Sequence, residues 1–432
     1  MQDPTVTNQT ASVQDGAAAQ EAVAEKFFTP QLFLIFLIVF IDLIGFGMVI
    51  PVLPIYAQTE PFMASPWEIG WLVSIYSWMQ FVFAPILGKL SDKYGRRPIL
   101  FISLLGSVVG YVVLGMANTV LLMFIGRIIS GITGGNISAA QAYIADVTKK
   151  EDRAKGMGLF GAAFGLGFVL GPAIGGISSK YGVHIPFFIA AGLSMTAATA
   201  VFFFLPESRK PRTDATIPER PFRLSALIEA LSERQFGTIN LNYFLLVTAF
   251  SIMTYAFVLY TSFEFGYTAE QNGYLFAFVG FAAVIGQGVL FGRLANRFGE
   301  TRLTVVGCAM MAAALFLIPF VTPEWMGLAG LLLVCALLAF GNSLASPSLT
   351  SVASKITHEH HQGSALGIMA SGASLARAIG PTIGGLLLNN SVNQMDHSTI
   401  YRTFVTSSAI MLVACLIAIY GVRLIGTRVA VS

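Results

Sequence analysis

Twelve long apolar stretches, joined by short polar loops, occupy most of this chain. About 20 apolar residues cross the hydrocarbon of a bilayer as a helix, because a helix satisfies its own backbone hydrogen bonds. Only 11% of the residues are charged and 55% are hydrophobic, whereas a soluble protein carries about 25% charged residues. We predict an all-α membrane protein with transmembrane helices near 31–56, 70–88, 98–117, 120–145, 156–178, 185–205, 238–262, 271–291, 303–320, 326–353, 363–388 and 403–425.

A basic, proline-containing segment between the sixth and seventh stretches cannot lie in a membrane, so it divides the chain into two halves. Within it, leucine and isoleucine recur at helical spacing, which predicts a short helix on the membrane surface. The polar N-terminus has no apolar run and is expected to be disordered. The predicted divisions are a cytoplasmic tail at 1–28, a six-helix bundle at 29–205, a cytoplasmic linker at 206–236, a second six-helix bundle at 237–425 and a short cytoplasmic tail at 426–432.

Lysine and arginine are concentrated in alternate loops. The segments 89–97, 149–155 and 293–302 are basic, whereas the intervening loops contain only Lys180 and Arg402. Because basic loops stay on the cytoplasmic side, both termini are predicted to be cytoplasmic. The net charge of +3 is too small to indicate nucleic-acid binding, and no spacing of residues suggests a cofactor or a metal site.

An internal repeat relates the two halves. A Gly-Pro-x-x-Gly-Gly pattern in the fifth helix recurs in the eleventh, and the loop after the second helix is echoed after the eighth. Parallel repeats of this kind place a transport pathway between the halves. Small residues allow close helix approach, and proline weakens a helix, so both copies are candidate hinges or packing surfaces: Gly171, Pro172, Gly175, Gly176, Gly380, Pro381, Gly384 and Gly385.

The loop after the second helix reads Gly88-Lys-Leu-Ser-Asp92-Lys-Tyr-Gly95-Arg96-Arg97. Its glycines permit a tight turn, and its aspartate can cap a helix or pair with arginine. This spacing resembles the signature loop of the major facilitator superfamily. The resemblance implies a fold of twelve helices in two pseudo-symmetric bundles.

Further motifs in the first half are similar to those of drug:proton antiporters, in particular tetracycline:proton exporters. They include Asp42-x-x-Gly45-x-Gly47 in the first helix, Arg127-x-x-x-Gly131 in the fourth, and the glycine-rich fifth helix that contains Gly165. The resemblance implies an exporter that exchanges its substrate for protons. It also implies that Asp146, with the Asp92 and Arg96 loop, forms a gate that latches the halves together on the inner side.

Three ionisable side chains lie well inside predicted helices: Asp42, Arg127 and Arg377. Such groups are costly in a membrane and are functional candidates by default. Asp42 could bind and release a proton near neutral pH, and we predict it to be the proton-coupling site. Arg127 could pair, extend toward the interface or line the cavity.

Arg377 has no equivalent in the resemblance, and three roles remain open for it. It could hold an anionic substrate, form an ion pair with Asp42 in one conformation, or fix helix packing. The remaining predicted cavity residues are polar or aromatic groups within helices, some of which could instead join helices together: Gln80, Asn136, Gln141, Tyr143, Tyr255 and Asn342.

We therefore expect a secondary active transporter in a plasma membrane, most simply a bacterial inner membrane. The favoured function is proton-coupled export of a small amphiphilic solute or drug by alternating access, by a monomer. The alternative is a transporter of an organic anion, a metabolite or a siderophore, with buried arginines as counter-charges. An enzyme fits poorly, because no nucleophile with a base and no phosphate-binding loop is present. A sensor or scaffold would not need the intact gate motif.

Overall fold

The computed structural model describes residues 29–149, 152–208, 233–357 and 362–429. Within these ranges the chain forms helices and loops, with one isolated bridge between Thr322 and Met326. The predicted surface helix of the linker, the three histidines at 358–361 and most of both predicted tails lie outside the described residues. The all-α prediction is confirmed.

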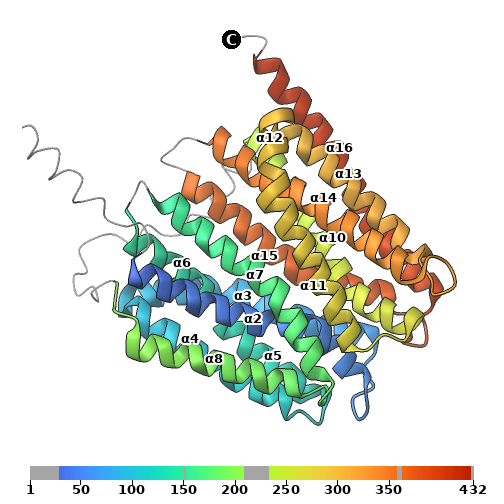
Figure 1. The fold of residues 1–432 in the computed structure, drawn as a ribbon, viewed down its shortest axis with the longest axis horizontal. Coiled ribbons are helices and arrows are strands. Elements are labelled where there is room, and N and C mark those ends of the chain that lie inside the picture. Colours follow the sequence, from blue (N-terminus) through green and yellow to red (C-terminus); the bar gives the residue numbers. More distant parts are fainter. Residues whose placement is uncertain (1–28, 150–151, 209–232, 358–361, 430–432) are drawn as a thin grey trace, which may run out of the picture.

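The first half forms one bundle, drawn in blue to green in Figure 1. Its helices are α2 (Pro30–Gln58), α3 (Pro66–Tyr94), α4 (Arg96–Gly115), α5 (Val120–Thr133), α6 (Asn136–Val147), α7 (Arg153–Ser179) and α8 (Ile185–Phe204). Each predicted helix is present, but the fourth is divided into α5 and α6. The division falls at Gly134 and Gly135, between the two helices.

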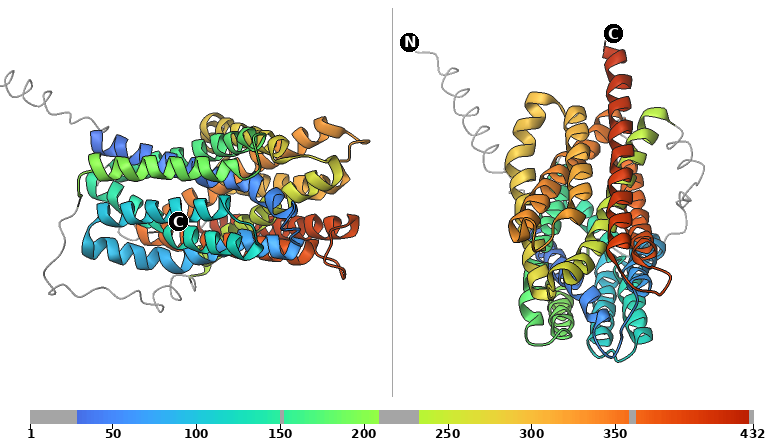
Figure 2. Two further views of the ribbon diagram at one scale, coloured as in Figure 1. Left: turned by 90° about the horizontal axis from the view of Figure 1, so that it is seen from below. Right: turned by 90° about the vertical axis from the view of Figure 1, so that its right-hand side faces the viewer.

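The second half forms the other bundle, drawn in yellow to red; Figure 2 sets the two bundles side by side. Its eighth transmembrane segment runs through α11, a π-helix and α12 before the basic turn. Its helices are α10 (Arg234–Phe265), α11 (Ala269–Ile285), η2 (Gly286–Phe291), α12 (Gly292–Phe298), α13 (Glu300–Leu317), η3 (Ile318–Phe320), α14 (Gly327–Ile356), α15 (Gln362–Leu388) and α16 (His397–Val429).

Eleven helical segments of the described chain are long and apolar enough to cross a membrane. The twelfth predicted span, α15, has 27 residues and is long enough. It is less apolar than the others because it carries Arg377, Pro381 and many glycine and serine residues. Its small residues allow it to pack between other helices rather than face lipid.

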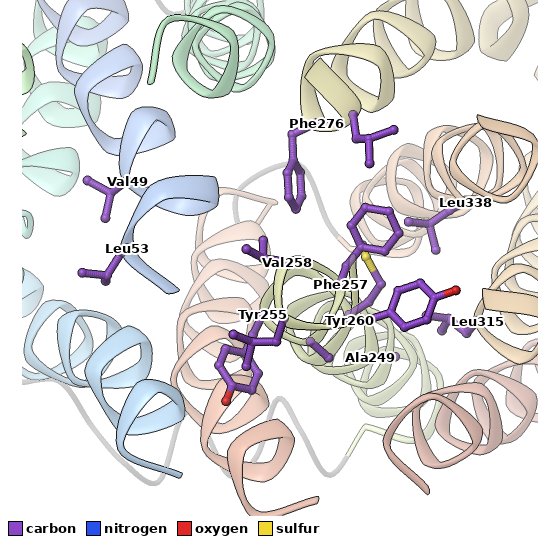
Figure 3. Close-up of a cluster of buried hydrophobic side chains, with 14 of the residues drawn as sticks. Val49, Leu53, Ala249, Tyr255, Phe257, Val258, Tyr260, Phe276, Leu315 and Leu338 are labelled. Carbon is purple, nitrogen blue, oxygen red and sulfur yellow. The ribbon is translucent and has the colours of Figure 1, made fainter. Parts of the chain in front are cut away.

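The core of the second bundle surrounds α10. Figure 3 shows Phe257 and Tyr260 directed toward Leu315 of α13 and Leu338 of α14, while Tyr255 lies on another face of the same helix. Because α10 is buried on several sides, it forms a firm support for whatever packs on it. Its neighbour α15 does so.

The two bundles meet along a set of glycines that we call the glycine seam: Gly70 of α3 against Gly385 of α15, and Gly176 of α7 against Gly273 of α11. A Cβ built on Gly70 would lie 2.8 Å from the Gly385 Cα, and one on Gly273 would lie 2.7 Å from the Gly176 Cα. These distances leave no room for a side chain, so the helix backbones are in direct contact.

Polar contacts reinforce this end of the molecule, which we call the closed end. Lys180 Nζ lies 2.8 Å from Glu270 Oε1 across the bundles, and the hydrogen bond to Glu270 raises the pKa of Lys180, so the pair is ionised at neutral pH. The hydroxyl of Thr382 donates to Ser74 Oγ at 2.8 Å. The Tyr255 hydroxyl donates to the Pro66 carbonyl.

At the opposite end, which carries the basic turns and is called the basic end here, the bundles are apart. Gly158, Gly161 and Gly165 of α7 have open space where a side chain would be, as does Gly367 of α15. In Figure 1, α6 and α12, which lie at this end of each bundle, are well separated. The molecule is therefore closed at one end and open at the other.

Replacing Gly273 with leucine is expected to push α7 and α11 apart at the closed end. The axes would move toward the about 8–10 Å separation of helices that meet through larger side chains. Spin labels at Tyr181 and Trp325, both exposed near this end, would report longer distances by pulsed electron resonance. The control is Gly192→Leu, since Gly192 has open space around it; an unchanged distance in Gly273→Leu would contradict the seam.

Candidate functional site

A cavity of about 1620 Å³ lies between the two bundles. Its lining runs from Tyr255 and Pro381, near the glycine seam, to Lys89 and Asp92 at the basic end. The side chains of Lys89 and Asp92 are exposed, so the cavity opens at that end. Both halves contribute to its walls, as the internal repeat predicts.

Asp42 reaches the cavity from the middle of α2. Its Oδ2 accepts a hydrogen bond of 3.2 Å from Asn136 Nδ2, and no other partner of Asp42 is recorded among the described residues. Asn136 is the first residue of α6, directly after the break at Gly134 and Gly135. The break thus brings the amide to the carboxylate.

Asn136 was predicted to face the substrate cavity, but the structure places it beside Asp42 instead. The two residues share a small void of about 10 Å³ behind the main cavity, which is about the size of one water molecule. Apart from these two, the void is lined by apolar side chains. The carboxylate therefore has one neutral donor in an otherwise apolar setting on this side.

Arg127 is 3% exposed and is engaged by α3. Its Nε donates to the Leu72 carbonyl at 3.1 Å and its Nη2 to the Val73 carbonyl at 3.3 Å. Its guanidinium also lies 4.6 Å from the centre of the Tyr76 ring. Although Arg127 contributes to the cavity lining, its donors join α5 to α3.

Arg377 lines the cavity from α15. Its Nη2 donates to Ser374 Oγ at 2.9 Å, one turn earlier on the same helix. Among the described residues, no ion pair joins Arg377 to Asp42 or to another carboxylate. The ion pair considered from the sequence is therefore absent from this conformation.

The other predicted cavity residues divide into two groups. Gln80, Gln141, Tyr255 and Asn342 line the cavity, and Gln80 Nε2 also donates to the Gly134 carbonyl at 2.9 Å, which supports the helix break. Tyr143 does not line it: the side chain is fully buried, and its hydroxyl donates to the Pro206 carbonyl at 2.9 Å. Beyond the break, α6 directs this ring toward the end of α8.

An aromatic wall, which we define as Phe46, Tyr76, Phe164 and Phe168, covers the first-half side of the cavity. The Phe46 ring centre lies 5.3 Å from that of Tyr76 and 6.1 Å from that of Phe168, and Phe164 and Phe168 stack at 5.4 Å. Sequence reasoning missed the phenylalanines. The four-residue spacing in α7 was the available signal, but the same helix drew attention for its glycines.

The gate motif forms a compact polar cluster at the basic end. Arg96 pairs with Asp92 at 2.8 Å and with Asp146 at 3.1 Å, and donates to Ser91 Oγ at 2.6 Å. Gly95 has φ = 101°, a conformation that favours glycine. Its counterpart in the repeat, Gly299, has φ = 81°. The repeated turn therefore has a conformational cause.

Glu207 completes this cluster and was not predicted. Its carboxylate accepts the backbone N–H groups of Arg96 at 2.9 Å and Arg97 at 3.1 Å, which begin α4. The Arg97 side chain donates to the Phe202 carbonyl. The recorded contacts of these residues stay within the first bundle, so the cluster does not latch the halves together in this open conformation.

The candidate hinge residues are packed tightly. A Cβ on Gly171 would lie 2.7 Å from Gly47 Cα, and one on Gly175 would lie 2.7 Å from the Met48 carbonyl oxygen. In the second half, Gly380 and Gly384 meet α10 in the same way. Both prolines lie inside continuous helices. The repeated glycines therefore seat α7 on α2 and α15 on α10.

Comparison with known proteins agrees with this architecture. The family model of the Major Facilitator Superfamily matches residues 35–381 and 239–429. The chain belongs to the major facilitator superfamily. It is 32% identical to the class B tetracycline resistance protein of Escherichia coli over 83% of this chain and 88% of that protein.

Two further relatives are more distant. Multidrug resistance protein 2 of Bacillus subtilis (strain 168) is 29% identical over 82% of this chain and 88% of that protein. The crystal structure of the human organic anion transporter MFSD10 (TETRAN) superposes with a TM-score of 0.66 at 24% identity, covering 90% of this chain and 100% of that one. The structural likeness concerns the fold alone.

Replacing Glu207 with alanine is expected to destabilise the protein by about 1 kcal/mol, the usual cost of losing a helix N-terminal cap. The first N–H groups of α4 would lose their acceptor. Thermal unfolding of the purified protein in detergent would measure the effect. Glu324→Ala, in an exposed loop at the closed end, is the matched control; equal stability of the two variants would contradict the capping role.

Proposed function

We propose that this protein is a proton-coupled antiporter that exports a small amphiphilic solute or drug by alternating access. The observation that carries the proposal is the position of Asp42. Of the two carboxylates that line the cavity, Asp92 lies at the open mouth and Asp42 lies deep between the bundles. A carboxyl group that can be reached from a cavity and is held by one neutral amide is suited to reversible protonation.

The size and chemistry of the cavity support an amphiphilic cargo. Its volume of about 1620 Å³ exceeds the about 300–1,000 Å³ of a typical site for a drug-sized ligand. The aromatic wall offers flat apolar contact area, and Gln80, Gln141 and Asn342 offer hydrogen bonds. The names of the tetracycline and multidrug resistance relatives favour a drug as cargo.

The basic loops support an orientation with the open end in the cytoplasm and both termini on that side. In a bacterial inner membrane, the conformation described here would be open to the cytoplasm. Cargo would enter from that side while the glycine seam separates the cavity from the exterior. The distribution of charge in the loops is the argument for this direction.

The proposed cycle uses the seam and the open glycine faces in alternation. Opening of the seam would expose Asp42 to the exterior, where it binds a proton as the cargo leaves. The bare glycines of α7 and α15 would then allow the bundles to approach each other at the basic end. In that state the Asp92, Arg96 and Asp146 cluster would lie between the halves, where it could act as the gate that the family resemblance implies.

Asp42→Asn is expected to abolish proton-coupled exchange while leaving the protein folded, because the amide preserves the hydrogen bond to Asn136 but cannot titrate. Everted vesicles with a pH-sensitive dye would measure it: added drug releases protons through the unaltered protein but not through the variant. Glu324→Gln serves as the control. Proton release by Asp42→Asn at the unaltered rate would reject the proposal.

Asn136→Leu is expected to move the pH at half-maximal exchange upward by about one unit. The amide donates to Asp42, and a hydrogen bond to an ionised group favours that form, so its loss favours the protonated acid. The pH profile of drug-driven proton release measures the shift. Asn136→Asp would add a second acid beside Asp42 and should broaden the profile. A profile unchanged by Asn136→Leu would show that the amide does not influence Asp42.

A further inference from the structure

The two arginines that line the cavity differ in how far their donors are used. A guanidinium carries five N–H donors. Arg127 gives two to backbone carbonyls and lies against the Tyr76 ring. Arg377 gives one to the Ser374 hydroxyl, and no other hydrogen bond or ion pair of Arg377 is recorded within the described ranges. Arg377 is thus the cavity arginine with donors to spare.

The charges deep in the cavity do not cancel. Two guanidinium groups face one carboxylate, Asp42, while Lys89 and Asp92 balance each other at the mouth. One positive charge therefore lacks an anion when Asp42 is ionised. Retaining such a charge away from bulk water is costly unless an anion compensates for it in some state of the protein.

The surroundings of Arg377 add polar groups suited to the same ligand. Asn240 of α10 lines the cavity and faces Gly372, which lies five residues before Arg377 on α15. Its side-chain oxygen is buried and has no hydrogen-bond partner in the described chain. Rotation of this amide exchanges its oxygen and nitrogen, so it can present donors instead. Tyr243, also on α10, lies close enough to interact electrostatically with Arg377.

The opposite wall has a different chemistry. Asp42 and the aromatic wall belong to the first bundle, whereas Arg377, Asn240 and Tyr243 belong to the second. A molecule that spans the cavity would therefore meet aromatic surface on one side and hydrogen-bond donors with a positive charge on the other. A planar carboxylate matches the fork of donors on a guanidinium.

We propose that Arg377 is the head-group site for an anionic substrate, an aromatic organic acid whose acidic group lies between α15 and α10 and whose rings lie on the aromatic wall. This assignment rests on the proposed function, because it assumes that cargo passes through this cavity. It gives the two arginines separate roles: Arg127 joins helices, and Arg377 selects charge. Bound anion and ionised Asp42 together would neutralise both arginines.

The test compares two probes that differ only in charge. The full-length protein in detergent is titrated with 4-(1-pyrenyl)butyrate and with its primary amide, and binding is followed by fluorescence anisotropy. The unaltered protein should bind the carboxylate about tenfold more tightly than the amide, as expected for hydrogen bonds to a charged group. Arg377→Gln should reduce this preference to about onefold with little change for the amide, and Arg377→Lys should keep part of it.

Arg302→Gln removes the same charge from an exposed position at the basic end and should keep the full preference. A melting curve establishes that each variant is folded. The proposal is overturned if the unaltered protein does not prefer the carboxylate, including the case in which neither probe binds, or if Arg377→Gln retains the preference. Binding at equilibrium needs no proton gradient, so this outcome is independent of whether Asp42 couples transport to protons.

Discussion

The direct contact of helix backbones along the glycine seam is the constraint on which the rest of the structure depends. In a bilayer, apolar side chains gain little by leaving lipid for protein, so helices associate through close packing and hydrogen bonds. Gly70 against Gly385, and Gly176 against Gly273, supply that packing at one end only. Because each bundle is internally packed, contact at one end and separation at the other produce a cavity between them. The position, access and depth of the site all follow from this asymmetry.

The charged groups in the cavity follow from the same arrangement. A charge in a membrane is tolerated where it has partners or reaches water. Arg127 has backbone carbonyls and an aromatic ring, and Asp42 has the amide of Asn136. Arg377 has a serine hydroxyl and the cavity. The three sites therefore suit three different tasks, namely joining helices, carrying a proton and binding an anion.

Much of the fold could be predicted from the sequence, because apolar stretches and repeats depend on local composition. The φ angles of Gly95 and Gly299 explain why the repeated turn requires glycine. What could not be predicted depends on direction in space. The break at Gly134 and Gly135 rotates α6, which turns Tyr143 away from the cavity and brings Asn136 to Asp42. Glu207 lies far along the chain from the helix that it caps, and no local pattern indicates that contact.

The central claim is that the cavity is open to one side of the membrane at a time. It is tested most directly by single cysteines at Ser371, which lines the open part of the cavity, and at Ser74, which is buried in the closed end. The three natural cysteines are buried, and a membrane-impermeant maleimide reports access from each side. The account predicts that Ser371→Cys reacts only in everted vesicles, and that Ser74→Cys reacts only in right-side-out vesicles and only during transport. Reaction of either cysteine from both sides would contradict it.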